Sequence, residues 1–324
     1  MAKPPNDYHH LFSPYYSTDY TQKYLQKTYN QSGTSSADVY SYDNCNKFIS
    51  YIENGLLYFK QVDSNPIQLK PLLLYYGFTH FLKACLLIVD PLYPQTTAVL
   101  SHGVSTRKKK KQQYEFLYDE IKIQRHGLFT HTAEKIFKIS QLENEKIAMA
   151  DLLMELPELV CLFKRLKNKN TCAKVHFNEK KTIAYVPEYV LDHYKMTADR
   201  FKEHIKSKWH IPIMDIQNDG TMLSVHFEQM YQPLAGNLPF RFNIQTGNYY
   251  LSLQKEGLAT ALPDLLILYL LLYNLSMISR YETEWWSDLF KEMPFYDLPF
   301  INSLLKIAEL KVPLLVSEWL DGWV

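Results

Sequence analysis

The chain has 324 residues, of which 47% are hydrophobic, and this composition predicts a packed globular protein and excludes a disordered one. Its formal net charge of +1 gives no overall attraction to nucleic acid or to acidic membrane surfaces. Glycine is scarce, at 10 residues, and the chain holds no P-loop, GxGxxG or GxSxG motif, so nucleotide-dependent and serine-hydrolase chemistries have no support.

Residues 1–43 are rich in Tyr, Ser, Thr and Asn, and we expect an N-terminal extension with one short helix over Tyr20–Tyr29. The first residues contain no apolar stretch, so no signal peptide is expected. Apolar residues then recur at helical spacing over Asn44–Gln61, and Ser64-Asn65-Pro66 interrupts the pattern.

The stretch Leu69–Asp90 is apolar on nearly every side and predicts a helix at the centre of a bundle. Pro71 suits the first turn of this helix, and Asp90-Pro91 ends it. The other helices must pack around it. On its apolar stripe lies His80, which we interpret as a satisfied core histidine, with a shared site with His102 or His126 as the alternative.

Segment 91–111 is irregular and ends in five consecutive basic residues. These are Arg107, Lys108, Lys109, Lys110 and Lys111. Such a run predicts a solvated loop, and the alternative is a contact with phosphate or RNA. No aromatic residue interrupts the run, which weakens the alternative.

We expect Tyr114–Ile123 to be a short strand or helix, and helices over Thr132–Phe137, Glu143–Met149 and Asp151–Lys167. Pro157 predicts a kink or break in the last of these. Residues 44–169 therefore form the first part of the helical bundle in this interpretation.

Between residues 170 and 257 the hydrophobic period changes from that of helices to that of strands, which predicts an inserted α+β module. Asp219-Gly220 and Thr246-Gly247-Asn248 each separate two alternating runs, and both sites predict β-hairpins. Thr197 is a plausible N-cap for a helix over Ala198–Lys208.

Residues 258–324 return to helical spacing, with helices over Leu258–Ser279, Ile301–Leu310 and Leu315–Trp319 and breaks at Pro294 and Pro299. The predicted fold is α+β and mainly α: a helical bundle built from both chain ends, with the β-rich module inserted. The apolar run 262–278 falls short of the about 20 residues that span a membrane, so we expect a cytoplasmic protein without a membrane segment. The cysteines, Cys45, Cys85, Cys161 and Cys172, form no CxxC pair and are expected to be free thiols.

Arg125 and His131 match the Arg-x(4–6)-His spacing of the HEPN helical domains, with His126 beside the Arg. In ribonucleases of that superfamily such a pair sits in a cleft, where the Arg polarises a phosphate and the His moves a proton without a metal. The spacing is common by chance, and Gly127 interrupts the helix that it would need. No histidine pair has metal-ligand spacing, so neither a metal nor a cofactor is expected.

Arg280 and Tyr281, followed by Trp285 and Trp286, place a guanidinium beside aromatic rings at the end of an apolar helix. One interpretation is internal cation–π packing. The other is the anchor of a protein interface, because Trp, Tyr and Arg concentrate binding energy in such interfaces.

The central LLLYYGFTHFLKACLLI stretch, Ser101-His102-Gly103, the stretch from His126 to Phe129, and Ile278-Ser279-Arg280-Tyr281 with Trp285 resemble the YaaC-like proteins of Bacillus and its relatives. The resemblance covers most of the chain. It implies an association with purine nucleotide synthesis, with IMP dehydrogenase as the first partner to test.

Two functions from different classes follow. The first is a non-catalytic regulatory protein that binds a cytoplasmic protein, with Arg280, Tyr281, Trp285, Trp286, His102 and His126 as its binding residues. The alternative is a metal-independent HEPN-like ribonuclease that uses Arg125 and His131, with RNA as its partner.

Overall fold

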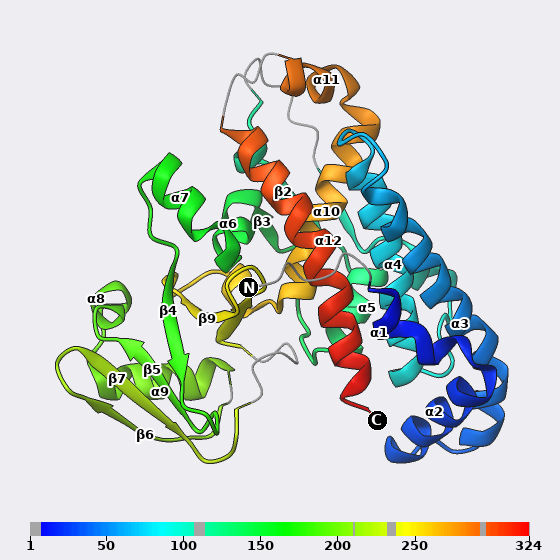
Figure 1. The fold of residues 1–324 in the computed structure, drawn as a ribbon, viewed down its shortest axis with the longest axis horizontal. Helices are drawn as coiled ribbons and strands as arrows, with labels where there is room; N and C mark the ends of the chain where they lie inside the picture. The colour runs from blue at the N-terminus through cyan, green and yellow to red at the C-terminus, as the bar shows by residue number, and fades with distance from the viewer. Residues whose placement is uncertain (1–7, 107–113, 210, 232–237, 292–295, 324) are drawn as a thin grey trace.

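The computed structural model describes residues 8–106, 114–209, 211–231, 238–291 and 296–323. They form a mainly α-helical α+β fold, in which a helical bundle from both ends of the chain carries a separate β-rich module (Figure 1). This confirms the predicted fold class, including the inserted module and its hairpins.

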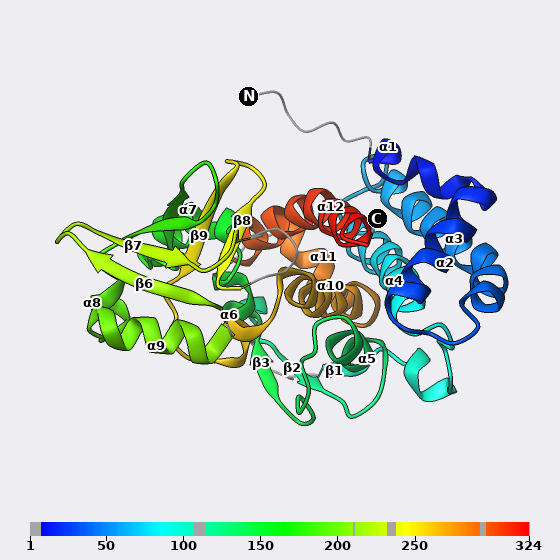
Figure 2. The ribbon, with the colours of Figure 1, turned by 90° about the horizontal axis from the view of Figure 1, so that it is seen from below.

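The bundle is organised around α4 (Lys70–Val89), and α3, α10 and α12 all pack on it (Figure 2). The C-terminal helices therefore pack against the central helix, as predicted. The bundle helices are α1 (His9–Phe12), α2 (Thr18–Gln31), α3 (Ala37–Val62), α4, α5 (Leu128–Lys135), α6 (Met149–Met154), α7 (Val160–Lys167), α10 (Asp264–Tyr281), α11 (Thr283–Lys291) and α12 (Asp297–Asp321).

α4 forms the centre because most of its surface is apolar. Leu74, Phe78 and Leu86 are fully buried, and burial of each such side chain stabilises the fold by about 1.5–3 kcal/mol. By length and composition α4 could also cross a membrane, but 67% of its apolar window is buried inside the protein. One stripe of α4 differs, because Tyr76, His80 and Lys83 are only half-buried.

The described part of the expected N-terminal extension belongs to the same core. Phe12 is fully buried and stacks on Phe81 of α4 with ring centroids 5.1 Å apart. The Tyr24 hydroxyl on α2 donates to the carbonyl of Leu320 on α12 at 2.9 Å. α2 and α12, which come from opposite ends of the chain, are therefore joined directly.

A three-stranded antiparallel sheet, ordered β1 (Val104–Thr106), β2 (Glu120–Ile123) and β3 (Lys146–Ala148), lies within the bundle half of the chain. The expected helix over Glu143–Met149 is wrong, because three of its residues pair with β2. Ile121 and Ile147 pair across the sheet and both are buried. Strands of three and four residues are too short to show their alternation in the sequence.

The module is a six-stranded antiparallel sheet in the order β6-β7-β5-β4-β9-β8, with two helices and a hydrophobic core of its own. Its elements are β4 (Cys172–Phe177), β5 (Ile183–Pro187), α8 (Val190–Tyr194), α9 (Ala198–Trp209), β6 (Ile213–Asn218), β7 (Met222–Phe227), β8 (Phe240–Asn243) and β9 (Asn248–Ser252). The predicted hairpins are β6–β7 and β8–β9. In the first, Gly220 has a φ of 88° and the Asp219 carboxylate accepts backbone N–H bonds from Thr221 and Met222.

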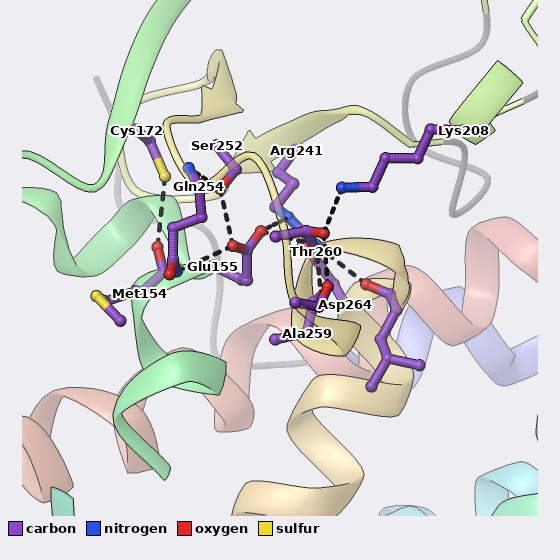
Figure 3. Close-up of polar contacts among 12 residues, drawn as sticks. Met154, Glu155, Cys172, Lys208, Arg241, Ser252, Gln254, Ala259, Thr260 and Asp264 are labelled. Carbon is purple, nitrogen blue, oxygen red and sulfur yellow. Dashed lines mark hydrogen bonds and ion pairs between the residues drawn. The ribbon is translucent and has the colours of Figure 1, made fainter. Parts of the chain in front are cut away.

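Buried charges join the module to the bundle (Figure 3). Arg241 on β8 is 3% exposed and forms ion pairs with Glu155, which follows α6, and with Asp264 in the first turn of α10. Lys311 on α12 is fully buried and contacts Asp264 at 2.7 Å and Glu158 at 2.9 Å. Burial would raise the pKa of Asp264, but Lys311 and Arg241 outweigh burial and lower it.

The prolines that were expected to limit helices agree with the structure at some positions and not at others. Leu258–Ala261 is a short 3-10 turn, and α10 starts only after Pro263. The predicted break at Pro157 is confirmed, because α6 ends at Met154 and a new helix starts after Pro157. The expected break at Pro299 is wrong, because Pro299 lies in the first turn of α12, where no backbone hydrogen bond needs its missing N–H. The expected separate helices over Ile301–Leu310 and Leu315–Trp319 are also wrong, because both segments and Pro313 lie in the continuous helix α12. Pro294 lies outside the described residues.

Candidate functional site

Two of the sequence segments that carried the resemblance meet through their backbones. The N–H groups of Leu128 and Phe129 donate to the carbonyls of Ser101 and His102 at 2.7 and 3.2 Å. Gly127 has a φ of 139°, and a Cβ at this position would lie 2.2 Å from the Cα of Gly103. Glycine at both positions therefore allows the contact that fixes the backbone of His102.

The His102 side chain points to tyrosines of the two central helices. Its Nδ1 lies 2.6 Å from the hydroxyl of Tyr75 on α4, and that hydroxyl lies 3.0 Å from the hydroxyl of Tyr269 on α10. Tyr269 in turn donates to the backbone carbonyl of His102 at 2.9 Å. The ring also packs on Tyr273, with centroids 5.3 Å apart.

Proton counting in this chain of contacts assigns the tautomer of His102. The Tyr269 hydroxyl donates its proton to the His102 carbonyl. In the contact between the two hydroxyls, Tyr75 must therefore be the donor and Tyr269 the acceptor. The remaining contact then requires that Nδ1 carry a proton and donate to the Tyr75 oxygen. Burial, with Arg280 and Lys83 nearby, lowers the pKa of His102, so the ring is neutral near pH 7 and its Nε2 is an unprotonated acceptor.

Three more cationic or titratable groups lie on α4 and α10. Arg280, near the end of α10, donates to the Tyr76 hydroxyl at 3.1 Å and to the Ser276 carbonyl at 3.0 Å. Lys83 lies 5.9 Å from the centroid of the Tyr51 ring. His80 stacks on Tyr58 with centroids 5.7 Å apart, and its buried Nδ1 has no hydrogen-bond partner among the described residues.

We call His80, Lys83, His102 and Arg280 the cationic cluster. Burial is the main cause that lowers the pKa of His80 and of Lys83, and for His80 the charge of Lys83 adds to it. For His80, Lys83 and His102, no carboxylate is among the groups that shift the pKa. Within the described residues, the Lys83 ammonium makes neither a hydrogen bond nor an ion pair. Of these four groups Lys83 and Arg280 carry the positive charge, because the lowered pKa of His80 and of His102 leaves both rings neutral near pH 7.

The predicted binding residues at the end of α10 separate into an exposed and a buried set. Tyr281 is 63% exposed, and the Arg280 guanidinium lies 5.2 Å from its ring centroid. Trp285 is half-buried and packs edge-on against Tyr114 at 4.7 Å. Trp286, by contrast, is 4% exposed, and its Nε1 donates to the Gln68 carbonyl at 3.1 Å. Trp286 is therefore a core residue, and its expected role as an exposed anchor is wrong.

The Arg125–His131 pair does not form a common site. Arg125 and His126 are exposed on a bend that precedes α5, so Arg125 is not on a helix with His131. The His131 Nε2 lies 2.9 Å from the Asp90 carboxylate, and its ring stacks on Tyr93. The predicted basic loop, Arg107 to Lys111, lies outside the described residues.

The sequence interpretation missed Lys83 and left His80 as a core histidine. The available signal was the spacing of Tyr76, His80 and Lys83, which places all three on one side of α4 at intervals of four and three residues. The contact of Arg280 with Tyr76 depends on the packing of α10 against α4, which no local pattern shows. Within the described residues no group of three His, Cys, Asp or Glu side chains could hold a metal ion.

Comparison with known proteins gives one result. A family model described as YaaC-like protein matches residues 13–320, nearly the whole chain. No curated protein and no solved structure matches. The matched range includes every helix and strand of the bundle and module except α1 and the last residue of α12, and it contains the segments from Ser101 to Gly103 and from Ile278 to Tyr281. The chain therefore belongs to the YaaC-like protein family.

Proposed function

We propose that the protein is a non-catalytic regulatory protein of the cytoplasm, which acts by binding another protein through the aromatic end of the bundle. The aromatic end of the bundle consists of Arg280, Tyr281 and Trp285. The observation that supports the proposal most is the exposure of Tyr281, 63%, directly beside a held guanidinium.

The aromatic end has its shape before any partner arrives. Hydrogen bonds to Tyr76 and Ser276 hold Arg280, and the edge-on contact with Tyr114 holds Trp285. Side chains that are ordered in the free protein lose little rotamer freedom on association, which favours affinity. Tyr, Trp and Arg are also the residue types that most often dominate binding energy at interfaces.

The partner that we propose is IMP dehydrogenase, which the family resemblance implies. Capture from a cytosolic lysate compares the wild type with Tyr281→Ala and with the control Tyr42→Ala, which removes a 72% exposed tyrosine of α3. We expect the wild type and the control to retain IMP dehydrogenase and Tyr281→Ala to lose it. Equal retention by all three proteins would contradict the proposal.

No observation favours the alternative ribonuclease, because His131 is paired with Asp90 and Arg125 lies exposed on a bend outside the helix of His131. We expect that the pure protein, incubated with total RNA without added metal, cleaves no more than a protein-free control. RNA cleavage by the wild type that disappears in both Arg125→Ala and His131→Gln would favour the ribonuclease over the regulatory protein. Glutamine at position 131 can keep a hydrogen bond to Asp90, so this variant separates chemistry from folding.

A further inference from the structure

A cavity of about 860 Å³ lies where the module meets the bundle. The segment after α5, the residues before α10 and the end of α12 line it from the bundle. The end of α9 and the segments before β6 and after β7 line it from the module. Small-molecule sites are often found between domains and have volumes of about 300–1,000 Å³. The position and the size of this cavity are therefore those of a ligand site.

Aromatic side chains line the cavity from both sides. Phe137 and Trp319 come from the bundle, and Trp209 and Phe227 come from the module. Phe137, Trp209 and Trp319 are only partly buried, so the folded chain leaves part of each ring uncovered. Aromatic rings pack favourably edge-on or offset against other rings. The lining therefore fits a ligand with a planar aromatic body.

The charged side chains that line the cavity are both basic. They are Lys138, which follows α5, and Lys208 near the end of α9, and no Asp or Glu is among the described residues of the lining. Charges of one sign in a hollow with apolar walls focus the electric field and attract the opposite charge. The cavity therefore favours an anion over a neutral or cationic ligand.

The ammonium of Lys208 is held in place with one N–H group to spare. It donates to the Lys255 carbonyl and to the Thr260 hydroxyl, both at 2.7 Å, and Figure 3 shows the second contact. An ammonium has three N–H donors, and this one forms no ion pair among the described residues. Burial lowers the pKa of Lys208, and the carboxylate of Glu155 offsets this effect only in part. A ligand carboxylate at the third donor would supply a counter-charge in direct contact.

Trp209 adds a second unused donor beside this ammonium. The Lys208 Nζ lies 4.8 Å from the centroid of the Trp209 ring. The indole Nε1 is buried and has no hydrogen-bond partner among the described residues. A buried N–H without an acceptor destabilises the folded state, so a ligand oxygen that reaches it stabilises the complex. Two neighbouring donors of this kind suit a carboxylate, which has two acceptor oxygens.

We propose that this cavity binds an aromatic carboxylate, with the carboxylate on Lys208 and Trp209 and the aromatic body between the rings of the module and those of the bundle. The inference goes beyond the partner contact of the aromatic end, because none of the three residues of that end lines the cavity. A ligand held in this way contacts both the module and the bundle, so its binding also stabilises their junction.

The test is calorimetric titration of the full chain with 2-naphthoate, 2-naphthamide and octanoate at pH 7 and constant ionic strength. 2-Naphthoate has both the ring and the charge, 2-naphthamide has the ring without the charge, and octanoate has the charge without the ring. We expect 2-naphthoate to bind most tightly. Lys208→Met keeps an apolar side chain and removes the ammonium, and it should weaken 2-naphthoate binding about tenfold while 2-naphthamide binding stays unchanged.

Two exposed methionines of the module locate the site. Met230 is 58% exposed and lines the cavity, whereas Met214 on β6 is 62% exposed and does not line it. Met230→Glu places a carboxylate at the cavity and should weaken 2-naphthoate binding about threefold or more by repulsion. Met214→Glu adds the same charge elsewhere on the module and should leave binding unchanged.

No saturable binding of 2-naphthoate to the wild type would overturn the proposal, and so would equal effects of Met230→Glu and Met214→Glu. Equal affinity for 2-naphthoate and 2-naphthamide would overturn the role of Lys208, and octanoate binding as tight as that of 2-naphthoate would overturn the aromatic body. If Lys208→Met does not fold, the three ligands on the wild type and the methionine pair decide, because both methionines are exposed and their replacement disturbs no core.

Discussion

Glu309 on α12 is a residue whose protonation depends on its position in the fold. It lines a cavity of about 840 Å³ together with Asp63, which follows α3, and residues of α1 and α3. Burial, and then the hydrogen-bonded carboxyl of Asp63, raises the pKa of Glu309 to about 7. In the unfolded chain its pKa is 4.5, so the folded state binds the extra proton between these two values.

The variant Glu309→Gln tests this assignment. A raised carboxyl pKa means that the wild type loses stability as pH rises from 4.5 through 7, because the charged form is then forced beside Asp63. Glutamine resembles the protonated acid at every pH. We therefore expect Glu309→Gln to melt at a higher temperature than the wild type at pH 8 and at a similar temperature at pH 5. A difference in melting temperature that is the same at both pH values would show that Glu309 does not titrate in this range.

At the scale of elements, the loop before β1 and the loop before α5 contact each other through their backbones, and this contact fixes the position of His102. Their contact leaves no room for a Cβ at Gly127 and little room for one at Gly103, and both residues have a positive φ. Backbone bonds from Leu128 and Phe129 complete the contact. Rigid placement of His102 is therefore a consequence of backbone geometry.

We expect Gly127→Ala to destabilise the protein by more than 2 kcal/mol, since the new Cβ would overlap the backbone of Gly103 as well as strain φ. The matched control is Gly220→Ala, which also has a positive φ but has open space around its Cβ position. Its cost should be about 1 kcal/mol, from backbone strain alone. Urea denaturation measures the change in the free energy of unfolding for both variants. A cost for Gly127→Ala no larger than that for Gly220→Ala would mean that the loops can separate without consequence.

The sequence predicts the elements that have long or repeated signals. The all-round apolar pattern of Leu69–Asp90 predicts the centre of the bundle, and Asp219-Gly220 predicts a hairpin turn. It does not predict the β1–β2–β3 sheet, because its strands are short and β3 lies more than 20 residues after β2. Of His80, Lys83, His102 and Arg280, only Lys83 was not identified from the sequence, and the contact of Arg280 with Tyr76 depends on packing between α10 and α4.

At the scale of the whole molecule, the module keeps its position on the bundle through the buried charges around Arg241. The network draws on α6, α10, α12 and β8, so it closes only when both halves of the bundle and the module are in place. Ser252 and Gln254 add hydrogen bonds to the Glu155 carboxylate (Figure 3). Such a junction couples the stability of the module to that of the bundle.

Arg241→Met should therefore loosen the module as well as lower stability. It leaves Glu155 without its ion pair and Asp264 with Lys311 alone, and breaking a buried pair in this way costs about 3–5 kcal/mol. Limited proteolysis should then cut between the module and the bundle faster than in the wild type. Lys202→Met removes an exposed ion pair with Asp215 and should change stability by less than about 1 kcal/mol. Equal effects of the two variants would contradict a structural role of the junction.

The central claim is that the protein acts by binding a partner through the aromatic end of the bundle. Its most direct test is the dissociation constant for purified IMP dehydrogenase, measured with the melting temperature for wild type, Tyr281→Ala and Trp286→Ala. Loss of an exposed anchor costs about 2 kcal/mol, so Tyr281→Ala should raise the dissociation constant about 30-fold at an unchanged melting temperature. Trp286→Ala removes a core side chain and should lower the melting temperature, while the protein that stays folded binds normally. Unchanged affinity in Tyr281→Ala, or no binding by the wild type, would contradict the claim.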